Sequence, residues 1–243
     1  MSAPYQIAPA PEAWTLPPGP LSGPLERPKP GAVPHVWLVR VAGHRESLED
    51  ALALFDEEEQ ARYAAFLRAA DRDRYAAAHA ALRRLLGAYL GTGPGEVAVG
   101  CEPCPLCEGP HGRPAVPGAG LHFSLSHSGE LVLLAFAATP VGIDVEESRD
   151  PAVVAEVSTC LHQREQAELT ALALADRASA FLRCWTRKEA YLKGTGEGLS
   201  GGLSRTYVGT GESPAAVPGW TLWDIPVDAG HAAAVAMRLE SSC

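Results

Sequence analysis

Apolar positions along the chain follow two repeats, one typical of strands and one typical of helices, and the changes between them mark the predicted elements. In the first half, the pattern predicts a strand, two helices and then a pair of strands around a Ser-Gly turn, at residues 35–41, 56–67, 71–91, 121–127 and 130–138. Asp56 and Glu59 have the spacing of a capping box, and Gly91 is a helix-ending glycine.

The second half repeats this order of elements. Its pattern predicts a strand, three helices and three returning strands, at residues 141–147, 151–160, 162–174, 177–193, 204–209, 219–227 and 231–240. Strands followed by helices and then a meander of strands are typical of the α+β class rather than of a regular βαβ series. We therefore expect two similar α+β lobes.

Three segments are predicted along the chain. Residues 1–34 hold ten of the 21 prolines and no periodic apolar pattern, which predicts an extended, poorly ordered arm. The first lobe is expected at 35–138 and the second at 139–243.

Composition narrows the functional classes. Acidic residues outnumber basic ones by 29 to 20, and the net charge of −9 excludes a general binder of nucleic acids or membrane surfaces, which needs a broad basic field. The apolar runs are too short to span a membrane, and the first residues lack the features of a signal peptide. We expect a cytoplasmic enzyme that holds any anionic ligand with a local group of cations.

Three of the six cysteines are regularly spaced within one loop. Cys101, Cys104 and Cys107 are each separated by two residues, and His111 follows closely. Four such ligands could hold one structural zinc ion. The alternative is a loop rich in Pro and Gly in which reduced thiols happen to gather. Both interpretations remain open at this point.

Two carboxylates share one face of the predicted strand at 141–147. Because side chains alternate along a strand, Asp144 and Glu146 point the same way, whereas Ile143 and Val145 point into the core. Neighbouring carboxylates repel unless a cation lies between them, and hard oxygen ligands suit Mg²⁺. The alternative is a solvated strand end.

The segment 184–194, "CWTRKEAYLKG", holds two of only three lysines in a chain that otherwise uses arginine. Glu189 and Lys193 are four residues apart, which is the spacing of an ordinary surface ion pair. However, the apolar residues around them predict a largely buried helix, and a compact ammonium group differs from a planar guanidinium in how it reaches phosphate oxygens. Lys193 is therefore also a candidate phosphate contact.

Other candidate anion ligands are scattered along the first half. His127 lies between two serines at a strand end, where several hydrogen-bond donors could meet an anion. Arg113 follows a glycine and precedes a proline on a stiff loop, and residues 62–84 form the most basic stretch of the chain.

Taken in order, these motifs resemble those of the 4′-phosphopantetheinyl transferases, in particular the large monomeric type that activates surfactin synthetase. The resemblance rests on Gly112-Arg113-Pro114, Ser126-His127-Ser128, Gly142-Ile143-Asp144-Val145-Glu146 and Trp185-x-x-Lys188-Glu189-Ala190-x-x-Lys193. The last two motifs, about 40 residues apart, are the specific ones. The fold that the resemblance implies is a pair of α+β lobes related by a pseudo-twofold axis, with coenzyme A in the cleft between them.

The resemblance also implies a reaction and roles for individual residues. Such enzymes transfer the phosphopantetheine arm of coenzyme A to a serine of an apo acyl or peptidyl carrier protein, and they require Mg²⁺. By motif position, the metal ligands would be Asp144, Glu146 and Glu189, with Glu189 also the base that deprotonates the serine. Lys193 would contact the pyrophosphate and stabilise the leaving group. The remaining contacts to coenzyme A would come from Arg72, Arg74, Arg113, Pro114, Ser126, His127 and Lys188.

Three departures from the family pattern stand out. The chain has Arg113 where the family has lysine, and Ser124 where many members have asparagine before the Ser-His pair. Arg72 and Arg74 would replace the lysines that meet the 3′-phosphate in the surfactin enzyme. Because carrier proteins are typically acidic, like this chain, we expect a small, largely apolar docking interface oriented by local arginines.

Two rival functions follow from the same residues. One is a zinc-stabilised binding module built around the cysteine loop, and the other is a different enzyme of coenzyme A or nucleotides that uses the same cations.

Overall fold

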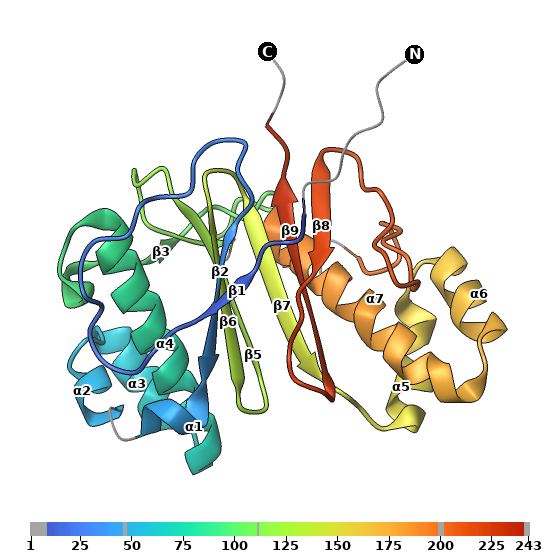
Figure 1. Ribbon diagram of the computed structural model, residues 1–243, viewed down its shortest axis with the longest axis horizontal. Coiled ribbons are helices and arrows are strands. Elements are labelled where there is room, and N and C mark those ends of the chain that lie inside the picture. Colours follow the sequence, from blue (N-terminus) through green and yellow to red (C-terminus); the bar gives the residue numbers. More distant parts are fainter. Residues whose placement is uncertain (1–8, 46–47, 111, 199–201, 241–243) are drawn as a thin grey trace.

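The protein, studied as a computed structural model, is a mixed α+β structure arranged as helix, sheet, sheet, helix (Figure 1). The structure describes residues 9–45, 48–110, 112–198 and 202–240. Three apolar clusters separate the layers, one between helix α4 and the first sheet, one between the sheets, and one between the second sheet and helix α7. No helix in these described ranges combines the length and the hydropathy needed to cross a bilayer.

The first sheet and its helices come from the first half of the chain. Its strands run in the order β1, β2, β6, β5, with β1 parallel to β2 and the other pairs antiparallel. The strand bounds are β1 Ala13–Thr15, β2 His35–Arg40, β5 His122–Ser128 and β6 Leu131–Ala137. The helices are α1 Val41–His44, α2 Leu48–Leu52, α3 Glu57–Ala65 and α4 Ala69–Leu90.

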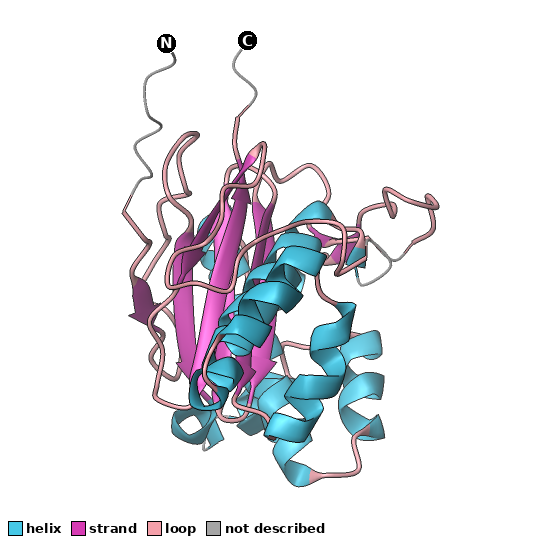
Figure 2. Cartoon of the chain, turned by 90° about the vertical axis from the view of Figure 1, so that its right-hand side faces the viewer, coloured by secondary structure: helices cyan, strands magenta, loops and turns pink. Residues whose placement is uncertain are grey.

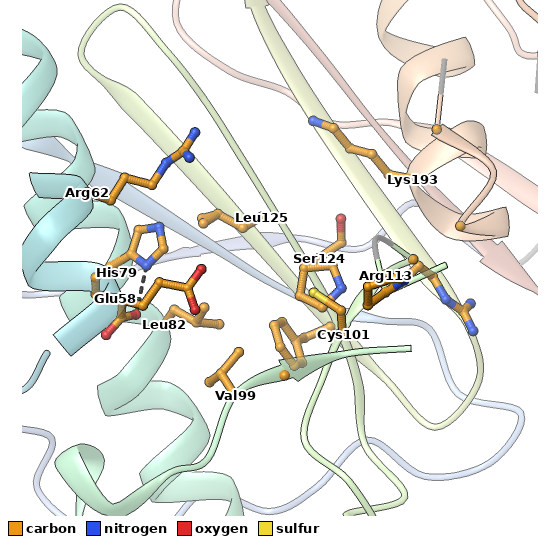
Figure 3. A pocket seen from close by; sticks show the side chains of 18 of the residues that line it. Glu58, Arg62, His79, Leu82, Val99, Cys101, Arg113, Ser124, Leu125 and Lys193 are labelled. Carbon is orange, nitrogen blue, oxygen red and sulfur yellow. Dashed lines mark hydrogen bonds and ion pairs between the residues drawn. The ribbon is translucent and has the colours of Figure 1, made fainter. Parts of the chain in front are cut away.

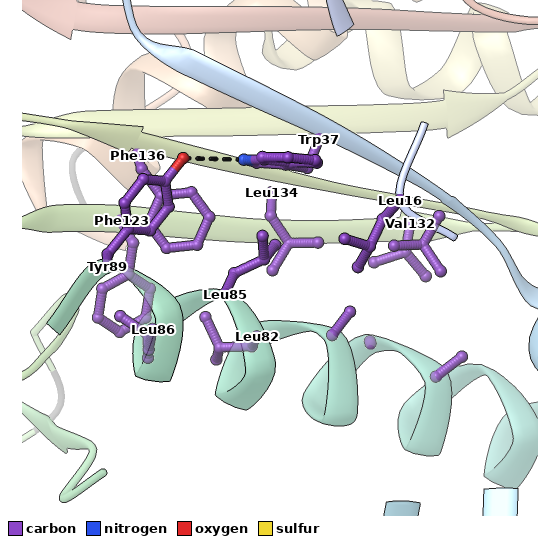
Figure 4. Packing of buried hydrophobic residues seen from close by; sticks show 14 of the residues in the cluster. Leu16, Trp37, Leu82, Leu85, Leu86, Tyr89, Phe123, Val132, Leu134 and Phe136 are labelled. Atoms are coloured by element: carbon purple, nitrogen blue, oxygen red, sulfur yellow. Dashed lines mark hydrogen bonds between the residues drawn. The ribbon is translucent and has the colours of Figure 1, made fainter. Parts of the chain in front are cut away.

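Helix α4 covers the outer face of this sheet because apolar residues recur along one side of it. Leu82, Leu85 and Leu86 pack against the sheet's apolar side chains (Figure 4). The indole N–H of Trp37 donates to the hydroxyl of Tyr89 at 3.0 Å, so the single polar group of each buried ring has a partner.

The second sheet comes from the second half of the chain, in the antiparallel order β7, β9, β8. Its strands are β7 Val141–Glu147, β8 Trp220–Asp224 and β9 His231–Arg238, and its helices are α5 Pro151–Val157, α6 Gln163–Ala171 and α7 Leu174–Thr195. Figure 2 shows helices in front of the sheet face that is turned to the viewer. Among these, α7 is the one whose side chains fill the cluster behind it.

The predicted α+β class and most predicted elements are confirmed. The capping box at Asp56 and Glu59 forms with both of its hydrogen bonds, at 2.9 and 3.2 Å. Helix α4 ends at Gly91, which has a φ of 72°. Each sheet is covered by one long helix, but the pseudo-twofold relation between the lobes and the three segment boundaries stay predictions.

Two predictions of secondary structure were wrong, in opposite directions. The expected strand at 204–209 consists of turns and irregular chain, because the backbone N–H groups of Val208 and Gly209 donate to the Glu165 carboxylate instead of to a neighbouring strand. Conversely, the proline-rich arm contributes the edge strand β1, and Leu16 just after it is buried. The cysteine loop adds a two-residue pair, β3 Gly100–Cys101 with β4 Pro114–Ala115.

Candidate active site

Strand β7 presents two carboxylates to helix α7. Asp144 and Glu146 alternate with branched side chains that fill the core between the sheets, as predicted. Gly142 lies on the same face as these carboxylates, and a Cβ at this position would collide with the carbonyl oxygen of Ala190. The glycine therefore allows α7 to lie directly on β7, which brings polar side chains of the helix to Asp144.

Helix α7 contributes Glu189 and Lys193 one turn apart. The Nζ atom of Lys193 lies 2.7 Å from Oδ1 of Asp144 and 2.9 Å from Oγ of Ser126. Within the described part of the chain, Lys193 forms its ion pair with Asp144 rather than with Glu189. The alternative of an ordinary surface pair along the helix is therefore wrong.

Asp144 is a buried carboxylate, with 3% of the residue exposed. Burial raises its pKa and Glu146 adds to the rise, although Lys193 and Ser126 act in the opposite direction. Its second oxygen, Oδ2, is buried and has no hydrogen-bond partner among the residues that the structure describes. A buried carboxylate oxygen in this state is stabilised by a cation.

Glu189 is half-buried beside the two strand carboxylates. Burial raises its pKa to about 7, Asp144 and Glu146 contribute to the rise, and Lys193 opposes it. A carboxyl group that titrates near neutrality can take up a proton at physiological pH, which an ordinary glutamate does poorly.

These residues fit a hard divalent cation, although they do not form a preorganised metal site. Within the described ranges, no three His, Cys, Asp or Glu side chains converge closely enough to hold a metal ion. The ammonium group of Lys193 instead partly neutralises the carboxylates. The oxygen donors, their mutual repulsion and the unpartnered Oδ2 of Asp144 all suit Mg²⁺.

A cleft of about 720 Å³ extends from Lys193 towards helices α3 and α4 (Figure 3). Its walls combine apolar side chains with basic ones, a lining that suits a ligand with both a ring system and phosphates, and the α3 end also carries the carboxylates of Asp56, Glu58 and Glu59. Lining residues that Figure 3 labels include Arg62, His79, Leu82, Val99, Arg113, Leu125 and Lys193.

Arg113 and Pro114, both predicted contacts of coenzyme A, line this cleft. The Arg113 guanidinium is held by the carboxylate of Glu102 and donates to the carbonyl oxygen of Gly194 at 2.7 Å. This carbonyl directly follows Lys193 in the chain. Arg113 therefore ties the cysteine loop to the end of α7.

Two basic residues of the cleft were not predicted as ligand contacts. Arg62 on α3 and His79 on α4 both line the cleft, whereas Arg72 and Arg74 do not. Arg74 instead donates to the carbonyl oxygen of Gly129 at 2.8 Å and pairs with Asp71. Arg62 lies in the stretch 62–84 that was recognised as basic, but sequence spacing gives no sign of which of its arginines face the cleft.

His127 lies near the end of β5, partly exposed to solvent. Surrounding protein atoms lower its pKa, and the nearby cations Arg74, Lys193 and His79 lower it further. Basic side chains thus surround His127, and Lys193 links this region to Asp144. An anion bound beside His127 would raise its pKa again.

Comparison with known proteins identifies the family. The sequence profile of the 4′-phosphopantetheinyl transferase superfamily matches residues 140–221, which include β7 and α7 and end within β8. The 4′-phosphopantetheinyl transferase HetI of Nostoc sp. is 32% identical over 212 residues, which cover 84% of this chain and 86% of HetI. The chain belongs to the 4′-phosphopantetheinyl transferase superfamily. The resemblance stated from the motifs is confirmed, and the protein is a transferase.

Other members of the superfamily match mainly shorter stretches. Sfp of Bacillus subtilis is 33% identical over 91 residues, 37% of this chain and 40% of Sfp. The 4′-phosphopantetheinyl transferase gsp of Aneurinibacillus migulanus is 37% identical over 90 residues, 37% of each chain.

One predicted contact residue of this transferase lies apart from the others. Lys188 is 2% exposed, its Nζ atom lies 2.7 Å from the buried Glu165 carboxylate, and it also donates to the carbonyl oxygen of Thr206. This pair stabilises the packing of α6 and the 206–209 segment against α7. The ammonium group of Lys188 is held by Glu165 and Thr206, away from the group formed by Asp144, Glu189 and Lys193. Lys188 is therefore not part of the proposed phosphate site.

The zinc hypothesis gains no support in this transferase. Cys101 and Cys107 are exposed, Cys104 is buried, and none of the three forms a disulfide with a described residue. No group of three metal-ligating side chains occurs in the described ranges, and His111 lies outside them. The zinc-stabilised binding module is therefore not pursued.

Proposed function

We propose that this transferase moves the 4′-phosphopantetheine arm of coenzyme A to the hydroxyl group of a serine in an apo acyl or peptidyl carrier protein, with release of adenosine 3′,5′-bisphosphate. The single observation that carries the proposal is the convergence of Asp144, Glu189 and Lys193 within the segment that matches the superfamily, with Lys193 also lining a cleft of about 720 Å³. We keep a cytoplasmic location and a monomeric state as parts of this proposal.

The ligand is proposed to span the cleft from the cations of α3 and α4 to the carboxylates of β7. Arg62 lines the cleft and forms no ion pair with a described residue, so it is the first candidate for the 3′-phosphate, in place of Arg72. Arg113 and Pro114 would border the adenine, and His127 would face the pyrophosphate.

Magnesium would be held by Asp144, Glu146 and Glu189, and when bound it supplies positive charge to the pyrophosphate oxygens. This assignment is supported by the unpartnered Oδ2 of Asp144 and by the raised pKa of Glu189, since both unfavourable features would be relieved by a cation. Lys193 would then leave its ion pair with Asp144 and pair with the pyrophosphate instead.

The chemical step is a nucleophilic substitution at the phosphorus that bears the pantetheine. The Glu189 carboxylate accepts the proton of the carrier serine, and the serine oxygen forms a bond to this phosphorus. The bond from the phosphorus to the bridging oxygen of the pyrophosphate breaks, and the electron pair stays on adenosine 3′,5′-bisphosphate. Lys193 and His127 donate to the phosphate oxygens on which negative charge increases.

The test is an intact-mass measurement of an apo carrier protein after incubation with the transferase, coenzyme A and Mg²⁺. We expect a gain of one phosphopantetheine arm, none with a carrier whose acceptor serine is alanine, and none in excess EDTA. Glu189→Gln should reduce the rate by about 10²-fold or more while coenzyme A still binds. If several carriers all keep their apo mass, the proposed function is overturned and a different coenzyme A enzyme becomes the leading hypothesis.

A further inference from the structure

The two sheets meet edge to edge at β5 and β7, which lie side by side in Figure 1 but belong to different sheets. In the described structure no backbone ladder joins them. Three serines of β5 form the connection instead. The Oγ atoms of Ser124, Ser126 and Ser128 accept hydrogen bonds from the backbone N–H groups of Ile143, Val145 and Glu147 at 3.1, 3.3 and 3.0 Å.

The spacing of these serines explains how one strand can make all three bonds. They are two residues apart, so all lie on the face of β5 that is turned to β7, while Phe123 on the opposite face packs against the α4 side. A serine hydroxyl has two lone pairs and one proton. Each serine can therefore satisfy a backbone N–H of β7 and still donate a hydrogen bond.

Two of the serines donate that hydrogen bond to a carboxylate. Ser126 donates to Oδ1 of Asp144 at 2.8 Å, and Ser128 donates to Oε2 of Glu146 at 3.4 Å. No carboxylate among the described residues accepts from Ser124. Hydrogen bonds from serines of β5 thus reach both carboxylates of β7 that the proposed function assigns to the metal.

Ser126 has no hydrogen-bonding capacity left for a phosphate. Its two lone pairs accept from the N–H of Val145 and from Nζ of Lys193, and its single proton goes to Asp144. Because Ser126 binds only Oδ1, the other oxygen of Asp144 stays unpartnered within the described part of the chain. This geometry differs from the direct phosphate contact that the motif predicts for Ser126.

We propose that Ser126 and Ser128 are positioning residues, which orient Asp144 and Glu146 for the divalent cation, whereas Ser124 only joins the two sheets. The proposal rests on the proposed function, because that function assigns the carboxylates to the metal. Residues that orient metal ligands change metal affinity by about 10- to 100-fold when they are removed. Ser126, with the shorter bond, should have the larger effect.

The experiment compares Ser126→Ala with Ser124→Ala. Both serines are buried, with 7% and 6% of the residue exposed, and each variant loses one backbone hydrogen bond from β7. Ser126→Ala also loses the bonds to Asp144 and Lys193, so its loss of stability in urea denaturation should be the larger of the two. Mn²⁺ serves as the probe, titrated into the full-length protein with coenzyme A but no carrier and followed by electron paramagnetic resonance. We expect Ser126→Ala to weaken Mn²⁺ binding about tenfold or more, and Ser124→Ala less than twofold.

Two further variants distinguish a local effect on the metal ligands from a general loss of folding. Ser126→Thr keeps the hydroxyl and should recover most of the Mn²⁺ affinity. Ser128→Ala removes a longer bond from a less buried position and should weaken Mn²⁺ binding several-fold.

The outcomes separate the two proposals. If the parent protein transfers the arm and binds Mn²⁺, but Ser126→Ala and Ser128→Ala bind it as well as Ser124→Ala does, only the positioning role is overturned. If the parent neither transfers the arm nor binds Mn²⁺, the proposed function is overturned, and this inference with it.

Discussion

The two roles proposed for Glu189 both require an ionised carboxylate, whereas its surroundings favour the protonated form. As a base and a metal ligand it must be ionised, yet burial and two neighbouring carboxylates raise its pKa to about 7. At subsaturating Mg²⁺, kcat/KM for the carrier should therefore fall by about tenfold per pH unit below 7. Higher Mg²⁺ should move this inflection to lower pH, since a cation favours the carboxylate. A pH–rate profile that is flat from 6 to 8 at low Mg²⁺ would contradict the prediction.

The raised pKa of Glu189 also predicts that its ionised form, which the proposed function needs, lowers the stability of the fold. The pKa of Glu189 rises on folding from its ordinary value of 4.5 to about 7, so its stabilising contribution is present below pH 4.5 and is lost as pH rises through 7. In EDTA at pH 8, Glu189→Gln should thus be more stable than the parent by about 1–3 kcal/mol. The gain, measured by urea denaturation, should shrink near pH 5, and equal stabilities at pH 8 would refute this account.

Lys193 should not tolerate arginine, although the chain otherwise prefers it. The ammonium group fits between Asp144 and Ser126 at 2.7 and 2.9 Å, where a planar guanidinium does not. Lys193→Arg should lower kcat about tenfold or more, equivalent to a loss of about 1.4 kcal/mol of transition-state stabilisation. Lys29→Arg is the matched control, because the Lys29 side chain is 74% exposed and should not matter. Parent-like kcat for Lys193→Arg would make the lysine incidental.

At the scale of elements, the contact between β7 and α7 depends on the absence of a side chain at Gly142. Gly142→Ala should destabilise the protein by about 1–3 kcal/mol and move Glu189 away from Asp144, because the new methyl group meets the backbone of α7. Gly43→Ala is a suitable control, since a Cβ there has nothing within 4 Å. Urea denaturation checks the prediction, and Gly142→Ala with the stability of the parent would show that α7 can shift freely.

Sequence patterns predicted the elements whose hydrogen-bond partners lie close together in the chain. The capping box of α3, the glycine end of α4 and the two strands around Gly129 were all readable from nearby residues. Strand β1 was not, because its three residues pair with β2 about twenty residues later and are flanked by prolines. The segment 204–209 resembles a strand but binds a buried glutamate that the pattern could not place.

The candidate site also combines features that nearby residues determine with features that depend on packing between distant segments. The family resemblance put Asp144 and Lys193 in one site, but their direct ion pair was not predicted. The period of a strand or a helix shows only which side chains share a face of that element. The helical period could also have excluded Lys188 from the site of Glu189, since adjacent residues of a helix point about 100° apart. Arg62 was missed because only the packing of α3 against α4 brings it to the cleft.

At the scale of the whole molecule, the acidic balance shapes the encounter with a carrier protein. The chain has a net charge of −9, and an acidic partner would not be attracted to it over long distances. We expect the carrier KM to change less than about threefold between 50 and 300 mM salt, because an apolar interface depends little on screening. A steep rise of KM with salt would instead point to a charged docking surface.

The separation of the two sheets along the chain has a consequence for biosynthesis. All strands of the first sheet precede residue 138, and all strands of the second follow residue 140. At 5–20 residues per second, the first sheet is synthesised roughly 5 to 20 s before the last strand of the second sheet, β9. During that interval the inner faces of β2 and β6, which include Val36, Leu38 and Leu133, still await the second sheet. A nascent chain that contains only the first sheet therefore exposes an apolar face that a chaperone could cover.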